Sequence, residues 1–123
     1  GWSFGADLAL KYALDDDVEG VILLSPPLRF ATDTDLERWA ASTTPLTVLV
    51  PEFDDFLRPE AADRRFARVP HAHVVPVHGA KHLWVGERFV QRVLDEVVAL
   101  VRPELGPLPR SWDGPMERAN VAP

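Results

Sequence analysis

Apolar residues along the chain recur at two alternating spacings, one typical of buried strands and one typical of amphipathic helices. Short, largely β-branched runs bounded by glycine or proline predict three strands, at residues 21–24, 46–50 and 72–77. Apolar positions three and four residues apart predict helices at 4–14, from residue 34 for about two turns, at 59–68 and at 87–101. Helix and strand therefore alternate, starting and ending with a helix.

This alternation predicts the α/β fold class. Strands that alternate with helices form a parallel sheet through right-handed crossovers, with helices on both faces. We therefore expect a parallel, three-layer α/β/α arrangement over residues 1–101. Residues 102–123 are rich in proline and have no apolar periodicity, so we expect a C-terminal tail. The chain begins within a motif, and we expect it to be a fragment or a truncated reading frame.

Composition excludes several classes of partner and chemistry. The net charge is −6 and no basic stripe is visible, which argues against a nucleic-acid partner. The longest apolar runs are far too short to cross a bilayer, so we expect no membrane partner. The chain has no cysteine, which rules out disulfides, thiolate metal sites and a cysteine nucleophile. This composition fits a cytoplasmic location.

The first five residues, Gly1-Trp2-Ser3-Phe4-Gly5, match the pattern G-x-S-x-G. In this pattern a serine occupies a sharp strand-to-helix turn that exposes its hydroxyl above a sheet. We expect the two glycines to pack against each other, so that a side chain at either one would clash. The amide of Phe4, at the start of the next helix, would point toward a developing oxyanion.

A serine hydroxyl needs a base, and the base needs an acid that orients it. Asp54 follows the second predicted strand and His82 follows the third, so both lie past carboxyl ends of parallel strands. This order, serine then acid then histidine, predicts a triad of Ser3, Asp54 and His82. Asp55 is the alternative acid.

Three segments together resemble the second half of the α/β-hydrolase family: Gly1-Trp2-Ser3-Phe4-Gly5, Pro51-Glu52-Phe53-Asp54 and Gly79-Ala80-Lys81-His82. The resemblance covers residues 1 to about 101 and implies that the chain is the C-terminal portion of an α/β-hydrolase fold. It assigns the acid to Asp54, although Pro51 stands where the family usually has a small residue. In that family the second oxyanion donor comes from a loop before the elbow, so we expect this chain as given to be catalytically incomplete.

The predicted loop from Ser25 to about Asp33 leaves no room for a cap domain. In this respect the chain resembles the small capless esterases, thioesterases and dienelactone-hydrolase-like enzymes. Pro26, Pro27, Leu28 and Phe30 are candidates for the mouth of the substrate pocket, although a loop stiffened by proline explains this segment equally well. Trp84 is a candidate for the wall of the pocket. The implied reaction is hydrolysis of a small ester or thioester, without a cofactor. The alternatives are a peptidase or acyltransferase of the same fold, or a non-catalytic fragment. The oligomeric state is not predicted.

Three other features of the sequence have less specific interpretations. His78 and His82 are four residues apart, as in helical metal sites, but Gly79 between them argues against a helix, and we expect no metal. Asp7 is interpreted as a charge that complements the dipole of the first helix. Trp2 is expected to be buried against the sheet.

Overall fold

The computed structural model describes residues 1–111, so the predicted tail is described only to residue 111. It contains a parallel sheet in the order β1 (Val21–Leu24), β2 (Leu46–Pro51) and β3 (Ala72–Val77). Gly1 and Trp2 run beside the free edge of β1, where Trp2 forms a parallel bridge with Leu24. The predicted strands are confirmed, with β2 one residue longer than expected.

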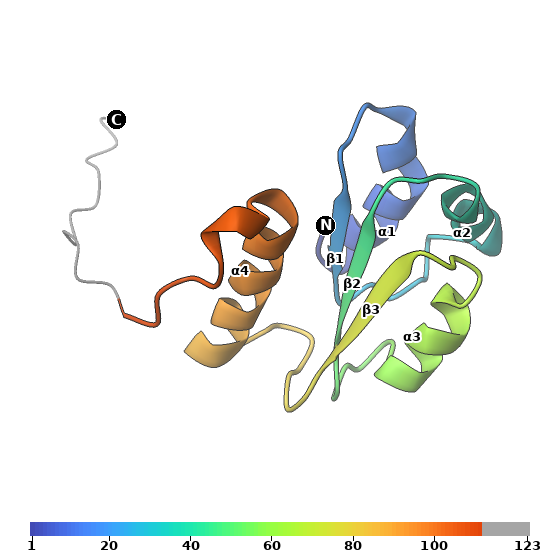
Figure 1. Cartoon of the computed structure of the whole chain (residues 1–123). Coiled ribbons are helices and arrows are strands. Elements are labelled where there is room, and N and C mark those ends of the chain that lie inside the picture. Colours follow the sequence, from blue (N-terminus) through green and yellow to red (C-terminus); the bar gives the residue numbers. More distant parts are fainter. Residues whose placement is uncertain (112–123) are drawn as a thin grey trace, which may run out of the picture.

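Helices cover both faces of this sheet, which confirms the α/β fold class and its three layers (Figure 1). On one face lie α1 (Phe4–Tyr12), α2 (Asp33–Ala40) and α3 (Pro59–Phe66), and on the other lies α4 (Glu87–Val101). Two short 3₁₀ helices, Ala13–Asp15 and Pro103–Leu105, follow α1 and α4. The helices α1 and α3 end two residues earlier than predicted, because their last turns continue as a 3₁₀ helix and a tight turn.

The start of α2 differs from the sequence prediction, which begins the helix at residue 34. Thr32 is the N-cap: its hydroxyl accepts the Asp35 N–H, and the Asp35 carboxylate accepts the Thr32 N–H at 2.7 Å, which forms a capping box. Lys11 also contacts Asp35, at 3.1 Å. Burial alone would raise the pKa of Asp35, but the hydrogen bonds from Thr32 and Lys11 together hold this pKa below its ordinary value.

The larger core lies between the sheet and the three helices α1, α2 and α3. It forms because alternate side chains of each strand point to the same face. Trp39 of α2 is fully buried there, and its indole N–H donates to the carbonyl of Leu10 at 2.8 Å. Its other main members are Ala6, Leu23, Leu36, Leu46, Val48, Val50, Ala62, Phe66 and Val69.

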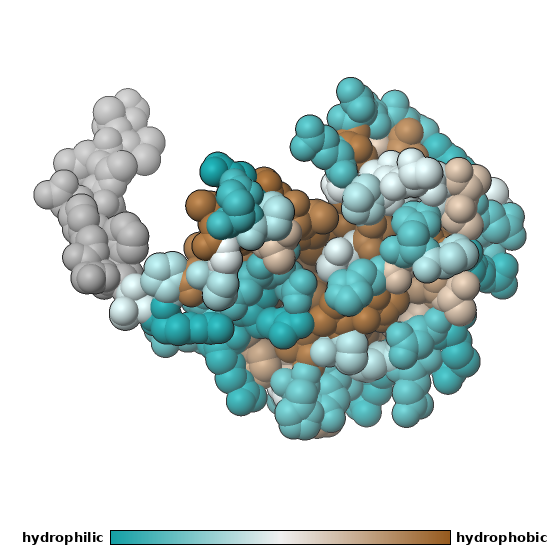
Figure 2. All heavy atoms as spheres, viewed as in Figure 1, coloured by the Kyte–Doolittle hydropathy of each residue, from teal (hydrophilic) through white to brown (hydrophobic). Residues whose placement is uncertain are grey.

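The smaller core lies on the opposite face, beneath α4. Leu49, Val75, Val77, Ala80 and Trp84 form it, and Phe89 and Val93 of α4 pack against it. No residue of α4 is fully buried. Figure 2 shows hydrophobic side chains between α4 and the sheet, where an apolar hollow of about 200 Å³ is bordered by Trp2, Leu24, Leu83, Trp84, Val90, Val93 and Leu94. Trp2 is 48% exposed, so the expectation that it is buried was wrong.

Within residues 1–111, no helix combines the length and the apolar character needed to span a bilayer.

Candidate active site

Ser3 occupies the turn between the edge segment Gly1–Trp2 and α1. Its backbone has φ 52° and ψ −120°, in a region that non-glycine residues rarely adopt. The Ser3 N–H donates to the carbonyl of Leu24 at 2.8 Å, and the Leu24 N–H donates to the carbonyl of Gly1 at the same distance. The sheet edge therefore holds the backbone on the amino-terminal side of Ser3, while α1 begins immediately after it.

The two glycines of the motif have different surroundings. A Cβ atom at Gly1 would lie 2.4 Å from the carbonyl oxygen of Gly5 and 2.8 Å from the Cα of Ala6, so only glycine fits there. A Cβ atom at Gly5 would meet nothing within 4 Å among the described residues. The prediction that a side chain would clash at either glycine was therefore wrong for Gly5, because the close approach is made by the Gly5 backbone and not by its Cα substituent.

The structure brings Ser3, His82 and Asp54 together, although Ser3 and His82 are 79 residues apart in sequence. His82 Nε2 is 2.9 Å from Ser3 Oγ, and His82 Nδ1 is 2.8 Å from Asp54 Oδ2. Since a carboxylate only accepts, Nδ1 carries the proton and Nε2 is the acceptor for the serine hydroxyl. The alternative acid, Asp55, is exposed and makes no hydrogen bond to His82.

Asp54 is held in place by the turn that follows β2. It is 2% exposed, and its second oxygen, Oδ1, accepts the N–H groups of Phe56 at 2.8 Å and Leu57 at 3.0 Å. The Asp54 N–H donates to the carbonyl of Pro51 at 3.2 Å. Both carboxylate oxygens thus have partners, and one of them remains directed at His82.

The amide of Phe4 begins α1 directly after Ser3. As the first helical residue it has no partner within the helix, and no hydrogen bond to this N–H is found in the described part of the chain. A free amide at a helix N-terminus, next to a serine hydroxyl, is the kind of donor that stabilises an oxyanion.

Exposed aromatic rings lie close to the candidate triad, at the residue after Ser3 and against the imidazole of His82. The rings of Phe4 and Phe30 meet edge to face at 4.9 Å, and Phe56 meets the imidazole of His82 in the same way at 4.8 Å. All three phenylalanines are about half exposed. The Arg29 guanidinium lies 5.8 Å from the centre of the Phe56 ring. These half-exposed rings form an apolar rim near the candidate triad, of which the sequence analysis pointed only to Phe30.

The residues predicted to line a pocket are mostly inside the protein. Leu28 belongs to the larger core and Trp84 to the smaller one, and each is less than a tenth exposed, whereas Pro27 is half-buried. Leu28 also has a positive φ of 50°. Their contact with a substrate stays a prediction, and for Leu28 and Trp84 little surface is left for it.

Asp7 has a role that its sequence position did not reveal. It is fully buried in α1, and its carboxylate accepts four consecutive backbone N–H groups, those of Leu28, Arg29, Phe30 and Ala31, at 2.8–3.4 Å. The carboxylate thereby fixes the backbone of the loop between β1 and α2, from which the side chain of Phe30 reaches the ring of Phe4. The sequence contained one sign that Asp7 is buried, because Asp7 lies on the same face of the helix as Leu10.

The other histidines do not join the candidate site. His78 contacts Glu52 at 2.7 Å, and His71 Nε2 lies 3.2 Å from the carbonyl of Thr44. Across residues 1–111 no three histidine, aspartate or glutamate side chains gather as a metal site would require.

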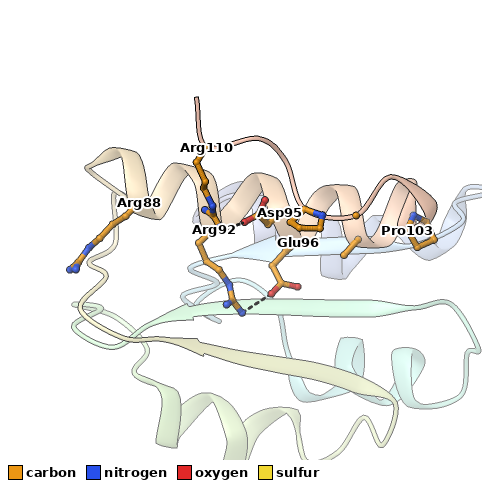
Figure 3. Close-up of a pocket in the computed structure, with 9 residues that line it drawn as sticks. Arg88, Arg92, Asp95, Glu96, Pro103 and Arg110 are labelled. Atoms are coloured by element: carbon orange, nitrogen blue, oxygen red, sulfur yellow. Dashed lines mark hydrogen bonds and ion pairs between the residues drawn. The ribbon is translucent and has the colours of Figure 1, made fainter. Parts of the chain in front are cut away.

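A separate pocket of about 450 Å³ lies along α4 and residues 103–110, away from the triad (Figure 3). Two ion pairs lie in its lining, one within α4 between Arg92 and Glu96 at 2.6 Å and one between Arg110 and Asp95 at 3.3 Å. Its charges are thus largely paired with each other, and it contains none of the predicted catalytic residues.

Comparison with known proteins supports the fold. No family model and no curated protein sequence matches the chain. A solved structure described as an alpha-beta serine hydrolase homologue from Coxiella burnetii is similar, with a TM-score of 0.61 and 24% sequence identity. The match covers 76% of this chain and 44% of that one, so the chain spans less than half the length of the similar protein. The matched part of the chain has the α/β-hydrolase fold.

Proposed function

We propose that the protein is a serine hydrolase that cleaves a carboxylic ester or thioester through a covalent acyl-enzyme. The observation that carries the proposal is the chain of two short contacts, Ser3 Oγ to His82 Nε2 at 2.9 Å and His82 Nδ1 to Asp54 Oδ2 at 2.8 Å. Side chains in this geometry have the roles of nucleophile, base and orienting acid. A similar solved structure is described as a serine hydrolase homologue, which supports the proposed class of reaction.

In the first half of the reaction, Ser3 Oγ attacks the substrate carbonyl carbon while its proton moves to His82 Nε2. Asp54 keeps the imidazole in the tautomer that can accept this proton and stabilises the imidazolium that forms. As the tetrahedral intermediate collapses, the bond to the leaving alcohol or thiol breaks and His82 returns the proton to it. A water molecule then repeats the sequence on the acyl-enzyme and releases the acid.

The Phe4 N–H contributes to the stability of the intermediate, because its hydrogen bond strengthens as negative charge develops on the carbonyl oxygen. One such donor contributes about 3 kcal/mol in other acyl-transfer enzymes. In the part of the chain that the structure describes, Phe4 supplies this donor. Its position at the start of α1 adds the favourable field of the helix N-terminus.

The apolar rim favours a substrate with a small apolar or aromatic group near the scissile bond. Only the loop of residues 25–32 separates β1 from α2, so this connection contains no cap domain over the site. Phe4, Phe30 and Phe56 offer exposed ring surface near the triad. Ester and thioester substrates with short acyl chains fit this open, apolar rim.

The experiment is a panel of short-chain p-nitrophenyl esters, acyl thioesters and amides tested on the protein in the full length that its gene encodes. We expect ester or thioester turnover that falls by at least 10³-fold in Ser3→Ala, because the nucleophile is removed. Ser42→Ala is the matched control. Ser42 has a buried hydroxyl with no hydrogen-bond partner among the described residues. Equal activity of wild type and Ser3→Ala would refute the proposal.

The same panel separates the rivals. Preferential cleavage of amides would identify a peptidase, and transfer of the acyl group to an added alcohol instead of water would identify an acyltransferase. Absence of any turnover together with an unreactive Ser3 would identify a non-catalytic protein.

A further inference from the structure

His82 lies in a tight turn and not in a helix or strand. The Trp84 N–H donates to the carbonyl of Lys81 at 3.0 Å, which closes the turn around His82 and Leu83. Trp84 itself has a positive φ of 56°. The contact with Asp54 fixes the imidazole, but the aim of Nε2 at Ser3 also depends on where the turn holds the His82 backbone.

Ser25, the residue directly after β1, contacts this turn at two points. Its side-chain Oγ lies 3.1 Å from the carbonyl oxygen of His82 and 2.8 Å from the indole Nε1 of Trp84. A carbonyl can only accept and an indole N–H can only donate, so the Ser25 hydroxyl donates to His82 and accepts from Trp84. The buried Ser25 hydroxyl therefore links the backbone of His82 to the indole of Trp84.

Several features show that Ser25 is itself firmly placed. It is 1% exposed, and its N–H donates to the carbonyl of Leu49 in the neighbouring strand at 3.0 Å. Its φ of 49° lies in the left-handed region, which a non-glycine residue adopts only when its surroundings impose it. In this conformation, Oγ lies within hydrogen-bond distance of the His82 turn.

The end of β1 is thus a common anchor for both reacting residues. Leu24 accepts the N–H of Ser3 through its carbonyl at 2.8 Å, and the next residue, Ser25, holds the carbonyl of His82 through its hydroxyl. Trp2 adds a second donor to that carbonyl, with its indole Nε1 at 3.2 Å. Neighbouring residues of one strand end therefore set the positions of nucleophile and base relative to each other.

We propose that Ser25 is a positioning residue for catalysis: through its hydroxyl it holds the His82 turn at the distance from Ser3 that proton transfer requires. The inference rests on the proposed function, since it concerns the same triad. Ser25 touches neither substrate nor reacting atoms and acts through His82. Its loss should lower kcat and leave KM nearly unchanged, because the surface that binds substrate stays intact.

The test uses Ser25→Gly in the protein at the full length that its gene encodes. Glycine accepts a φ of 49° without strain, so this variant removes the hydroxyl while keeping the backbone conformation accessible. We expect kcat to fall about 10- to 100-fold, as a displacement of order 1 Å in a catalytic group produces. Ser42→Ala, the control for loss of a buried hydroxyl, should keep wild-type kcat. The kcat of Trp84→Phe should lie between those of Ser25→Gly and Ser42→Ala, because Ser25 keeps its hydrogen bond to His82.

A second readout does not depend on turnover. The proton on His82 Nδ1, bound to Asp54, should give a low-field ¹H NMR signal in wild type that weakens or disappears in Ser25→Gly as the loosened turn admits water. Wild-type kcat together with an unchanged signal in Ser25→Gly would overturn the inference, even if Ser3→Ala is inactive. If wild type turns over no substrate, the proposed function fails, while the signal still decides whether Ser25 positions His82.

Discussion

Replacement of Asp7 tests whether one buried carboxylate holds the loop of residues 28–31. Leu28 and Ala31 are buried, so Asp7→Ala leaves their two N–H groups without partners, whereas Arg29 and Phe30 are exposed and can bind water. An unsatisfied buried donor costs about 1–3 kcal/mol. For the two unsatisfied N–H groups of Asp7→Ala, we therefore expect a loss of about 4 kcal/mol in the free energy of unfolding.

Asp7→Asn refines this estimate, because the carboxylate oxygens have different partners. Oδ2 accepts from Arg29, Phe30 and Ala31, and Oδ1 accepts from Leu28 alone. An asparagine that keeps its oxygen at the Oδ2 position leaves only the Leu28 N–H unsatisfied, so the expected loss is about 2 kcal/mol.

Urea unfolding of the full-length protein, followed by circular dichroism, measures these losses. Asp17→Asn changes the charge equally at an exposed position and should stay within about 0.5 kcal/mol of wild type. Amide hydrogen exchange should also accelerate at residues 28–31 in both Asp7 variants. The reasoning fails if Asp7→Ala unfolds within 1 kcal/mol of wild type, or if Asp7→Asn is the less stable of the two.

Three further predictions follow from the described contacts. Gly1→Ala should abolish hydrolysis because its Cβ would meet the Gly5 carbonyl at 2.4 Å, whereas Gly5→Ala should remain active; equal activities would contradict the elbow geometry. The lowered pKa of Asp35 means that its ionised form stabilises the fold above the unfolded-state pKa of about 4, and that this stability is lost as pH falls through the folded-state value. Asp35→Asn should therefore lower Tm more at pH 7 than at a pH well below 4, and a constant difference would refute this. Phe56→Ala should raise KM more for esters with an aromatic acyl group than for acetate esters of the same alcohol. An equal change in KM for both would argue against substrate contact with this ring.

Local patterns in the sequence specified the elements because each strand carries its own boundary signals. The run 21–24 lies between Gly20 and Ser25-Pro26-Pro27, and α3 begins at Pro59 as predicted. The start of α2 was misplaced because three polar residues, Thr32, Asp33 and Thr34, are all good caps. Which of them caps the helix depends on Asp35, whose side chain completes the capping box with Thr32.

The positions of Ser3, Asp54 and His82 were accessible to sequence reasoning because carboxyl ends of parallel strands meet at one edge of the sheet. The supporting contacts were not, because they join residues that no local pattern relates. Asp7 resembles any acidic residue in the first turns of a helix, and Ser25 resembles any serine at a strand end. Their roles depend on a loop and a turn whose contacting residues lie 21 to 59 positions away in sequence.

The most direct measurement is the site at which an active-site-directed fluorophosphonate attaches to the full-length protein, determined by peptide mass spectrometry. The hydroxyl of Ser3 is activated only if His82 Nε2 lies within proton-transfer distance, as the 2.9 Å contact indicates. We predict a single adduct on Ser3 that is lost in Ser3→Ala and strongly slowed in His82→Ala. An adduct on another residue, or labelling that persists in Ser3→Ala, would contradict the account.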